Sequence, residues 1–174
     1  MRADRMSEPM QRKALKPAEL RLERLTADHV EDVLSVERLS FADPWSREAY
    51  RHELGENELA HYYGCLLDER LLGFGGFWQI LTEGHIANVA VHPDFRGQGV
   101  GQLLVTRLMT ACRALGGTAM TLEVRQSNTA ALALYHKFGF KSAGVRPHYY
   151  NNGENALIMW AGLDARSEKS EDRK

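Results

Sequence analysis

The chain has 174 residues, a length that suits a single domain with its own hydrophobic core. Apolar residues make up 44%, charged residues 26%, and the formal net charge is -1, so nothing in the composition favours a nucleic-acid-binding protein. No apolar run approaches the ~20 residues of a membrane helix. The isolated cysteines, Cys65 and Cys112, indicate a reducing cytoplasm rather than a disulfide framework or a zinc site. We therefore expect a cytoplasmic protein that binds neither nucleic acid, membrane nor metal.

Both ends of the chain are charged and poor in large apolar residues. Such segments bury too little apolar surface to offset the entropy of ordering them. The sequence therefore predicts a disordered N-terminal extension at residues 1–19, a folded domain at residues 20–162 and a disordered C-terminal tail at residues 163–174.

The first half of the domain predicts a strand, two helices and a run of strands. Residues 20–25 alternate apolar and polar side chains, as a half-buried strand does. Apolar side chains recur at helical spacing over residues 30–39, behind a cap at Thr26 or Asp28, and Ser46 opens a second short helix. Three further strands are predicted at residues 62–67, 71–81 and 85–91.

The second half begins with a glycine-rich loop and a helix over residues 99–115, which Gly116-Gly117 terminates. A strand, a helix and two more strands are predicted at residues 118–124, 128–138, 140–145 and 155–160. Strands dominate the first part and strand–helix units follow, so the fold class is α/β with a mixed sheet.

The strongest signal for chemistry is the loop segment Arg96-Gly97-Gln98-Gly99-Val100-Gly101, which follows a strand and opens a helix. Glycines let backbone N–H groups turn toward one point, and a helix N-terminus adds a positive dipole. The segment therefore suits a phosphate or diphosphate, although its spacing is not that of a nucleoside triphosphatase loop. A glycine-rich turn that merely starts a helix is the plainer alternative.

Two weaker signals are Glu123 and Tyr135. Glu123 lies at the end of an apolar strand, where a carboxylate often faces solvent or would pair with the neighbouring Arg125. Tyr135 lies about two helical turns beyond Asn128, and simple packing explains an aromatic residue there equally well. Neither residue alone predicts catalysis.

Together these segments resemble the GCN5-related N-acetyltransferase (GNAT) superfamily. The match runs in order from Val89-Ala90-Val91 and Pro93, through R-x-x-G-x-G from Arg96, to N-x-x-A-x-x-L-Y-x-x-x-G-F from Asn128 to Phe140. The likeness covers roughly residues 20–162. It implies the GNAT fold, with a mixed, mostly antiparallel central sheet and helices on both faces. It also implies transfer of an acetyl group from acetyl-CoA to an amine.

Three further segments resemble the RimI type, bacterial enzymes that acetylate the N-terminal alanine of ribosomal protein S18. They are F-A-D-P-W-S at residues 41–46, L-E-V-R with S-N at residues 122–128, and Y-Y with a later A-x-x-M at residues 149–159. The likeness implies the α-amine of ribosomal protein S18 as acceptor. The alternatives are a lysine or small-molecule amine on the same fold, and a non-catalytic CoA-binding regulatory module. Gly97 and Gln102 depart from the basic residues common in the superfamily.

The resemblance also implies roles for individual residues. Glu123 would be the general base, acting through water, and Tyr135 the general acid for the leaving thiolate. The cofactor would contact Val89, Ala90, Val91, Arg96, Gly97, Gln98, Gly99, Val100, Gly101 and Asn128. The N–H of Val91 would stabilise charge on the thioester oxygen.

Four aromatic residues are candidates for the walls of a peptide groove: Phe41, Trp45, Tyr149 and Tyr150. For Phe41 and Trp45, packing in the core is the equal alternative.

Overall fold

The computed structural model describes residues 14–163. The predicted tails at residues 1–13 and 164–174 lie outside that range. Within it the helices are α1 (Val30–Ser40), α2 (Arg47–Gly55), α3 (Val100–Ala114) and α4 (Thr129–Lys137), with 3-10 turns η1 (Pro17–Glu19), η2 (Ala27–His29) and η3 (Pro93–Phe95). The strands are β1 (Leu20–Arg24), β2 (Ala60–Leu67), β3 (Arg70–Ile80), β4 (Glu83–Val91), β5 (Ala119–Arg125), β6 (Lys141–Arg146) and β7 (Ala156–Gly162). Their order along the chain is the order that the sequence predicts.

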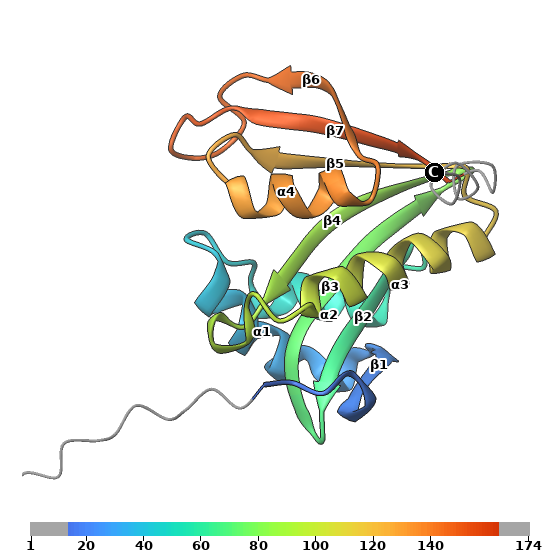
Figure 1. Ribbon diagram of the computed structural model, residues 1–174, viewed down its shortest axis with the longest axis vertical. Helices are drawn as coiled ribbons and strands as arrows, with labels where there is room; N and C mark the ends of the chain where they lie inside the picture. The colour runs from blue at the N-terminus through green and yellow to red at the C-terminus, as the bar shows by residue number, and fades with distance from the viewer. Residues whose placement is uncertain (1–13, 164–174) are drawn as a thin grey trace, which may run out of the picture.

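The strands of residues 14–163 form one seven-stranded sheet in the order β1-β2-β3-β4-β5-β7-β6. Neighbouring strands are antiparallel, except that β4 and β5 run parallel. Helices α1 and α2 cover one face, and α3 and α4 cover the other (Figure 1). The prediction of a mixed, mostly antiparallel sheet with helices on both faces is confirmed.

Strands β4 and β5 pair along part of their length and then separate. Their ladder joins residues 83–86 to residues 119–122. Beyond it β4 continues beside β3, whose register shifts between Gly76 and Phe77, while β5 continues beside β7. The diverging ribbons leave residues 88–91 of β4 without a strand on the β5 side (Figure 1). This separation opens the sheet near the start of α3.

The two outer boundaries of the domain differ from those drawn on the sequence. Leu163, assigned to the C-terminal tail, is 3% exposed and belongs to the core under α3 and α4. At the other end, Leu15 is partly buried against the cluster of Cys65, Leu72, Val100 and Leu104. Leu15 of the predicted extension therefore packs on the domain, and disorder stays a prediction for residues 1–13.

None of the helices within residues 14–163 is both long enough and apolar enough to cross a membrane.

Candidate active site

A groove of about 530 Å³ lies where β4 and β5 separate. Its walls are the end of β4, the glycine-rich loop with the first turn of α3, one side of α4, and the end of α1. The lining includes Val89, Ala90, Val91, Arg96, Gly97, Gly99, Val100, Gly101, Asn128, Tyr135 and Phe41. The groove thus brings together every residue proposed to contact the cofactor except Gln98, together with Tyr135.

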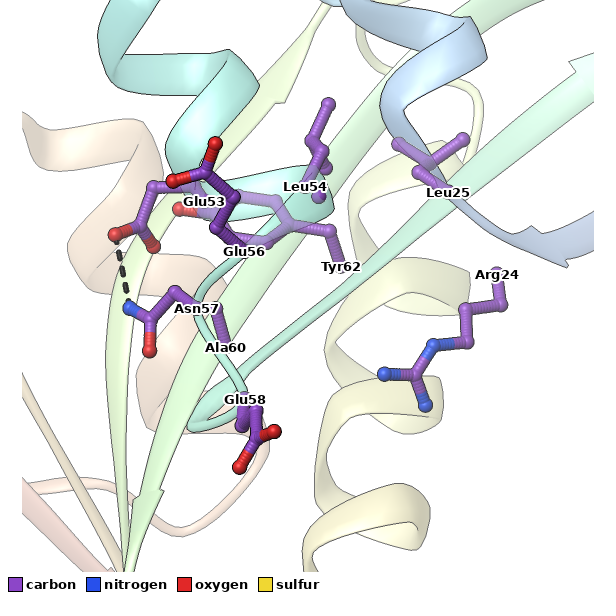
Figure 2. Close-up of a pocket in the computed structure, with 10 residues that line it drawn as sticks. Arg24, Leu25, Glu53, Leu54, Glu56, Asn57, Glu58, Ala60 and Tyr62 are labelled. Atoms are coloured by element: carbon purple, nitrogen blue, oxygen red, sulfur yellow. Dashed lines mark hydrogen bonds between the residues drawn. The ribbon is translucent and has the colours of Figure 1, made fainter.

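A second hollow, of about 180 Å³, lies elsewhere, between the end of β1, the end of α2 and the start of β2 (Figure 2). None of its lining residues also lines the groove. Its acidic side chains are partly engaged already, since Glu53 accepts hydrogen bonds from Asn57 Nδ2 and Trp78 Nε1. It offers no route to the residues that carry the candidate chemistry.

The glycine-rich loop has a backbone that non-glycine residues rarely adopt. Gly97 has φ of +73° and Gly99, the N-cap residue of α3, has φ of +87°. A Cβ atom added at either residue would meet nothing within 4 Å, so the dihedral angle rather than crowding favours glycine there. The loop opens into the groove at the N-terminus of a 15-residue helix, which suits a diphosphate.

Two side chains fasten this loop to its surroundings. The Nε atom of Arg96 donates to the carbonyl oxygen of Val91 at 3.0 Å, which ties the loop to the end of β4. The Oε1 atom of Gln98 accepts from the backbone N–H of Leu15 at 3.2 Å. Gln98 therefore turns toward the N-terminal segment rather than into the groove.

Asn128 lies on the opposite wall as the N-cap residue of α4. Its Oδ1 atom accepts from the N–H of Ala131 at 3.1 Å, which satisfies one of the free donors at the helix start. Because this bond fixes the side-chain oxygen, the amide NH₂ group is the polar part of Asn128 left for the groove.

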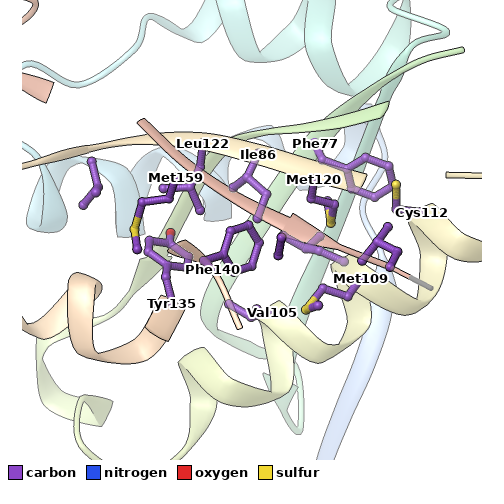
Figure 3. Close-up of a cluster of buried hydrophobic side chains, with 14 residues drawn as sticks. Phe77, Ile86, Val105, Met109, Cys112, Met120, Leu122, Tyr135, Phe140 and Met159 are labelled. Atoms are coloured by element: carbon purple, nitrogen blue, oxygen red, sulfur yellow. The ribbon is translucent and has the colours of Figure 1, made fainter. Parts of the chain in front are cut away.

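Tyr135 lines the groove from α4 and is 7% exposed. Its ring packs on Phe140, with centroids 5.6 Å apart, within the cluster between α3, α4 and the sheet (Figure 3). Burial, and secondarily the neighbouring Tyr150, raises the pKa of the Tyr135 hydroxyl. The phenol therefore stays protonated at neutral pH and can serve as a proton donor but not as a base.

Glu123 approaches from the other face of the sheet. Leu122 and Val124 point into the cluster beneath α3 and α4, so the intervening Glu123 points away from it. Its side chain is 12% exposed, with Oε2 2.6 Å from His85 Nε2 and Oε1 3.2 Å from Arg146 Nε. The alternatives of a solvent-facing carboxylate and of pairing with Arg125 are both wrong.

Tyr150 lies in the loop between β6 and β7. Burial raises the pKa of its hydroxyl. The guanidinium of Arg125 lies 3.9 Å from the centre of the Tyr150 ring, and Arg125 also bonds Glu154 at 3.2 Å. These contacts tie the β6–β7 loop to the end of β5.

The other proposed acceptor residues are placed differently. Phe41 lines the groove, and the half-exposed Tyr149 packs edge-on against Tyr150 with ring centroids 5.1 Å apart. Trp45 instead packs on Tyr50, 5.3 Å between ring centroids, and does not line the groove. Core packing, the alternative reading of these aromatics, thus describes Trp45 but not Phe41.

A buried polar chain beside the groove has no signal in the sequence. Glu37 is 1% exposed and accepts from the backbone N–H of Trp45 at 3.0 Å and from the hydroxyl of Tyr50 at 2.8 Å. The Tyr50 hydroxyl in turn accepts from Asn88 Nδ2 at 2.6 Å. Burial raises the pKa of the Glu37 carboxyl. The chain joins α1 to the residue that precedes Val89, and so steadies the β4 wall.

His85 and Arg146, the two partners of Glu123, are also residues that sequence reasoning missed. His85 faces Glu123 because β4 and β5 are parallel with His85 opposite Thr121, two residues before Glu123 on the same face of the sheet. Residues on the two strands are far apart in sequence, so their register was needed to bring the pair together.

Comparison with known proteins shows the family of the chain. Residues 30–140 match the model of the acetyltransferase (GNAT) family. A Bacillus subtilis (strain 168) protein, provisionally named a ribosomal protein bS18-alanine N-acetyltransferase, is 38% identical over 138 residues, or 79% of this chain and 91% of its own. The bS18-alanine N-acetyltransferase of Salmonella typhimurium is 35% identical over 127 residues, which cover 71% of this chain and 84% of that enzyme.

A solved structure agrees as well. The crystal structure of the ribosomal-protein-S18-alanine N-acetyltransferase from Escherichia coli superposes with a TM-score of 0.78 at 28% identity, covering 89% of this chain and 99% of that one. The chain therefore belongs to the GNAT acetyltransferase family, and it is an acetyl-CoA-dependent N-acetyltransferase. The relatives described above are enzymes of the RimI type, whose names specify the alanine of this ribosomal protein.

Proposed function

We propose that this protein acetylates the N-terminal alanine of ribosomal protein bS18 in the cytoplasm. The observation that carries the proposal is the arrangement of Glu123 and Tyr135 on opposite faces of the sheet, at the gap between β4 and β5. Similarity to bS18-alanine N-acetyltransferases over most of the chain supports the same acceptor. The exposed ring of Tyr149 and the half-buried ring of Tyr150 provide a wall suited to an unfolded N-terminus.

In this proposal the groove holds acetyl-CoA, which supplies the acetyl thioester. Backbone N–H groups of Gly97 to Gly101 bind the diphosphate, and β4 residues Val89 to Val91 offer main-chain groups to the pantetheine arm. The open β4 edge fits this purpose because no strand among residues 14–163 occupies it beyond residue 86.

The proton steps divide between the two faces. An α-amine has a pKa near ~8, so a substantial fraction must lose a proton before it can attack at neutral pH. Glu123 accepts that proton through water, while His85 and Arg146 hold its carboxylate in place. As the amine nitrogen bonds to the acetyl carbon, the N–H of Val91 stabilises charge on the thioester oxygen. Tyr135 then protonates the sulfur as the carbon–sulfur bond breaks, the nitrogen releases its extra proton to water as the amide forms, and the tyrosine oxygen regains a proton from water.

A peptide assay tests the acceptor. Purified full-length protein is incubated with acetyl-CoA and a peptide that carries the bS18 N-terminal sequence, beginning with alanine and containing an internal lysine. We expect one acetyl group on the α-amine and an equal release of CoA. The same peptide with a blocked α-amine should stay unmodified. Acetylation of the lysine in the blocked peptide would contradict the proposal and favour a lysine acetyltransferase.

A further inference from the structure

The N-terminal segment that precedes the first strand touches the glycine-rich loop. The backbone N–H of Leu15 donates to Oε1 of Gln98 at 3.2 Å, and this contact joins residues 83 positions apart. Leu15 also packs on the cluster that contains Val100 and Leu104, the first residues of α3 that turn inward. The segment therefore contacts both the glycine-rich loop and the start of α3.

The loop needs such support because little else restrains it. An added Cβ atom at Gly97 or Gly99 would meet nothing within 4 Å, so no other part of residues 14–163 packs against the loop at these points. Both residues are glycines, whose backbone torsions are less restricted than those of any other residue type. The side-chain contacts of Arg96 to Val91 and of Gln98 to Leu15 join the loop to β4 and to the N-terminal segment.

The loop is also poor in charge. Gly97 and Gln102 are neutral, and the one basic side chain, Arg96, donates from Nε to a carbonyl oxygen while its terminal NH₂ groups keep the positive charge. Backbone N–H groups are therefore the main other donors to a diphosphate, and their contribution depends on how well they are oriented before the ligand arrives. Fixing the loop in advance lowers the cost of ordering it on binding.

We propose that residues 14–19 are a positioning element of the acetyl-CoA site, which acts through Gln98 to hold the glycine-rich loop in its diphosphate-binding conformation. Gln98 is then a positioning residue rather than a cofactor contact, in line with its absence from the groove lining. This inference rests on the proposal that the loop binds the CoA diphosphate, but it is independent of which acceptor is used.

A double-mutant cycle in the full-length chain tests the inference. The variants are Leu15→Ala, Gln98→Ala and their combination, and the matched control is Leu81→Ala, at a leucine that is 88% exposed in the β3–β4 turn. Acetyl-CoA affinity is measured by calorimetry without acceptor. Each single variant should weaken binding about three- to tenfold, the range expected for one lost hydrogen bond or anchor. Leu15→Ala removes the packing that seats the segment and Gln98→Ala removes the hydrogen bond that the seated segment makes. Because the second contact depends on the first, the combined loss should be smaller than the sum of the single losses.

Steady-state kinetics supply a readout that a general loss of stability would not move. The KM for acetyl-CoA should rise while kcat and the KM for the peptide stay unchanged. With S-acetylpantetheine, which lacks the diphosphate, wild type and both variants should have equal kcat/KM.

Each contrary result has a distinct meaning. Unchanged acetyl-CoA affinity in both single variants, or fully additive losses, would overturn the positioning role. Equal losses with acetyl-CoA and S-acetylpantetheine would also overturn it, because the loop would then not act on the diphosphate. Failure of wild type itself to bind acetyl-CoA would instead reject the underlying site.

Discussion

His85 Nε2 lies 2.6 Å from Oε2 of Glu123, across the position where β4 and β5 stop pairing. Glu123 is the first β5 residue beyond the last paired position, Leu122, so the contact spans the opening of the gap. Arg146 approaches the other carboxylate oxygen from β6. Three strands thus fix one carboxylate beside the groove, which is what a positioned general base requires.

Replacing the base should remove turnover without removing the cofactor site. We expect Glu123→Gln to lower kcat about 10²–10⁴-fold, the usual contribution of a positioned acid or base. Acetyl-CoA affinity should stay within twofold of wild type, roughly, because Glu123 does not line the groove. Stopped-flow kinetics measures kcat, and calorimetry measures the affinity for acetyl-CoA. Glu83→Gln, at the start of β4, is the matched control, and a fully active Glu123→Gln would reject the role of the carboxylate.

The His85 contact should affect rate rather than binding. We expect His85→Ala to lower kcat roughly tenfold, because the Glu123 carboxylate loses one of its two fixed partners. The KM for acetyl-CoA should not change. His52→Ala, at an exposed histidine of α2 that pairs with Glu56, is the control and should behave as wild type. An unchanged kcat in His85→Ala would show that Arg146 alone is sufficient.

Gly99 and Gly116 form a matched pair at the two ends of α3. Their φ angles are +87° and +86°, and an added Cβ would meet nothing within 4 Å at either residue. Gly99→Ala and Gly116→Ala should therefore each lower the free energy of unfolding by about 1–2 kcal/mol. The affinity for acetyl-CoA should fall in Gly99→Ala, because Gly99 lines the groove, and should stay unchanged in Gly116→Ala. Equal affinities in the two variants would contradict diphosphate binding at the loop.

Two aromatic residues of similar size should give opposite results. Tyr150→Ala should raise the KM for the acceptor peptide, because Tyr150 packs beside the exposed Tyr149 in the proposed acceptor wall. Trp45→Ala should instead lower the melting temperature, because it removes the ring that packs on Tyr50. Thermal unfolding and peptide kinetics on both variants separate the roles. A normal peptide KM in Tyr150→Ala would remove Tyr150 from the acceptor site.

Buried Glu37 should make stability depend on pH. Burial raises the pKa of the Glu37 carboxyl. At pH values just above the ordinary glutamate pKa of ~4.3, the native state therefore holds a proton that the unfolded chain has released. The free energy of unfolding therefore falls as pH rises through that interval. We expect Glu37→Gln to flatten this slope in urea unfolding between about pH 4 and pH 7. Glu48→Gln, an exposed residue of α2, should keep the slope, and an equal slope in both variants would argue against the effect.

Sequence patterns predicted the elements well because each carries a local signal. The alternation in residues 20–25, the cap at Ser46 and the glycines that end α3 all act over a few residues, and the structure has the corresponding β1, α2 and α3. Many of the residues that line the groove could be named for a similar reason. The glycine-rich loop and the motif that begins at Asn128 are each an unbroken stretch of sequence.

Features that depend on distant parts of the chain could not be predicted in this way. The partner of Glu123 required the register of β4 against β5, and Arg125, its neighbour in sequence, pairs with Glu154 instead. From the sequence, Glu37 would be expected on the solvent-facing side of an amphipathic helix. The structure buries it, because the Tyr50 hydroxyl of α2 donates to its carboxylate. Leu15 lies in a charged segment, and its packing depends on an apolar site on α3.

The most direct test of the account is the acetylation state of bS18 in cells. Intact-mass spectrometry would be applied to bS18 from cells that lack this protein, and from the same cells that express wild type or Glu123→Gln. We predict that the N-terminal alanine is free without the protein, acetylated with wild type, and free again with Glu123→Gln. Full acetylation in cells that lack the protein would contradict the central claim.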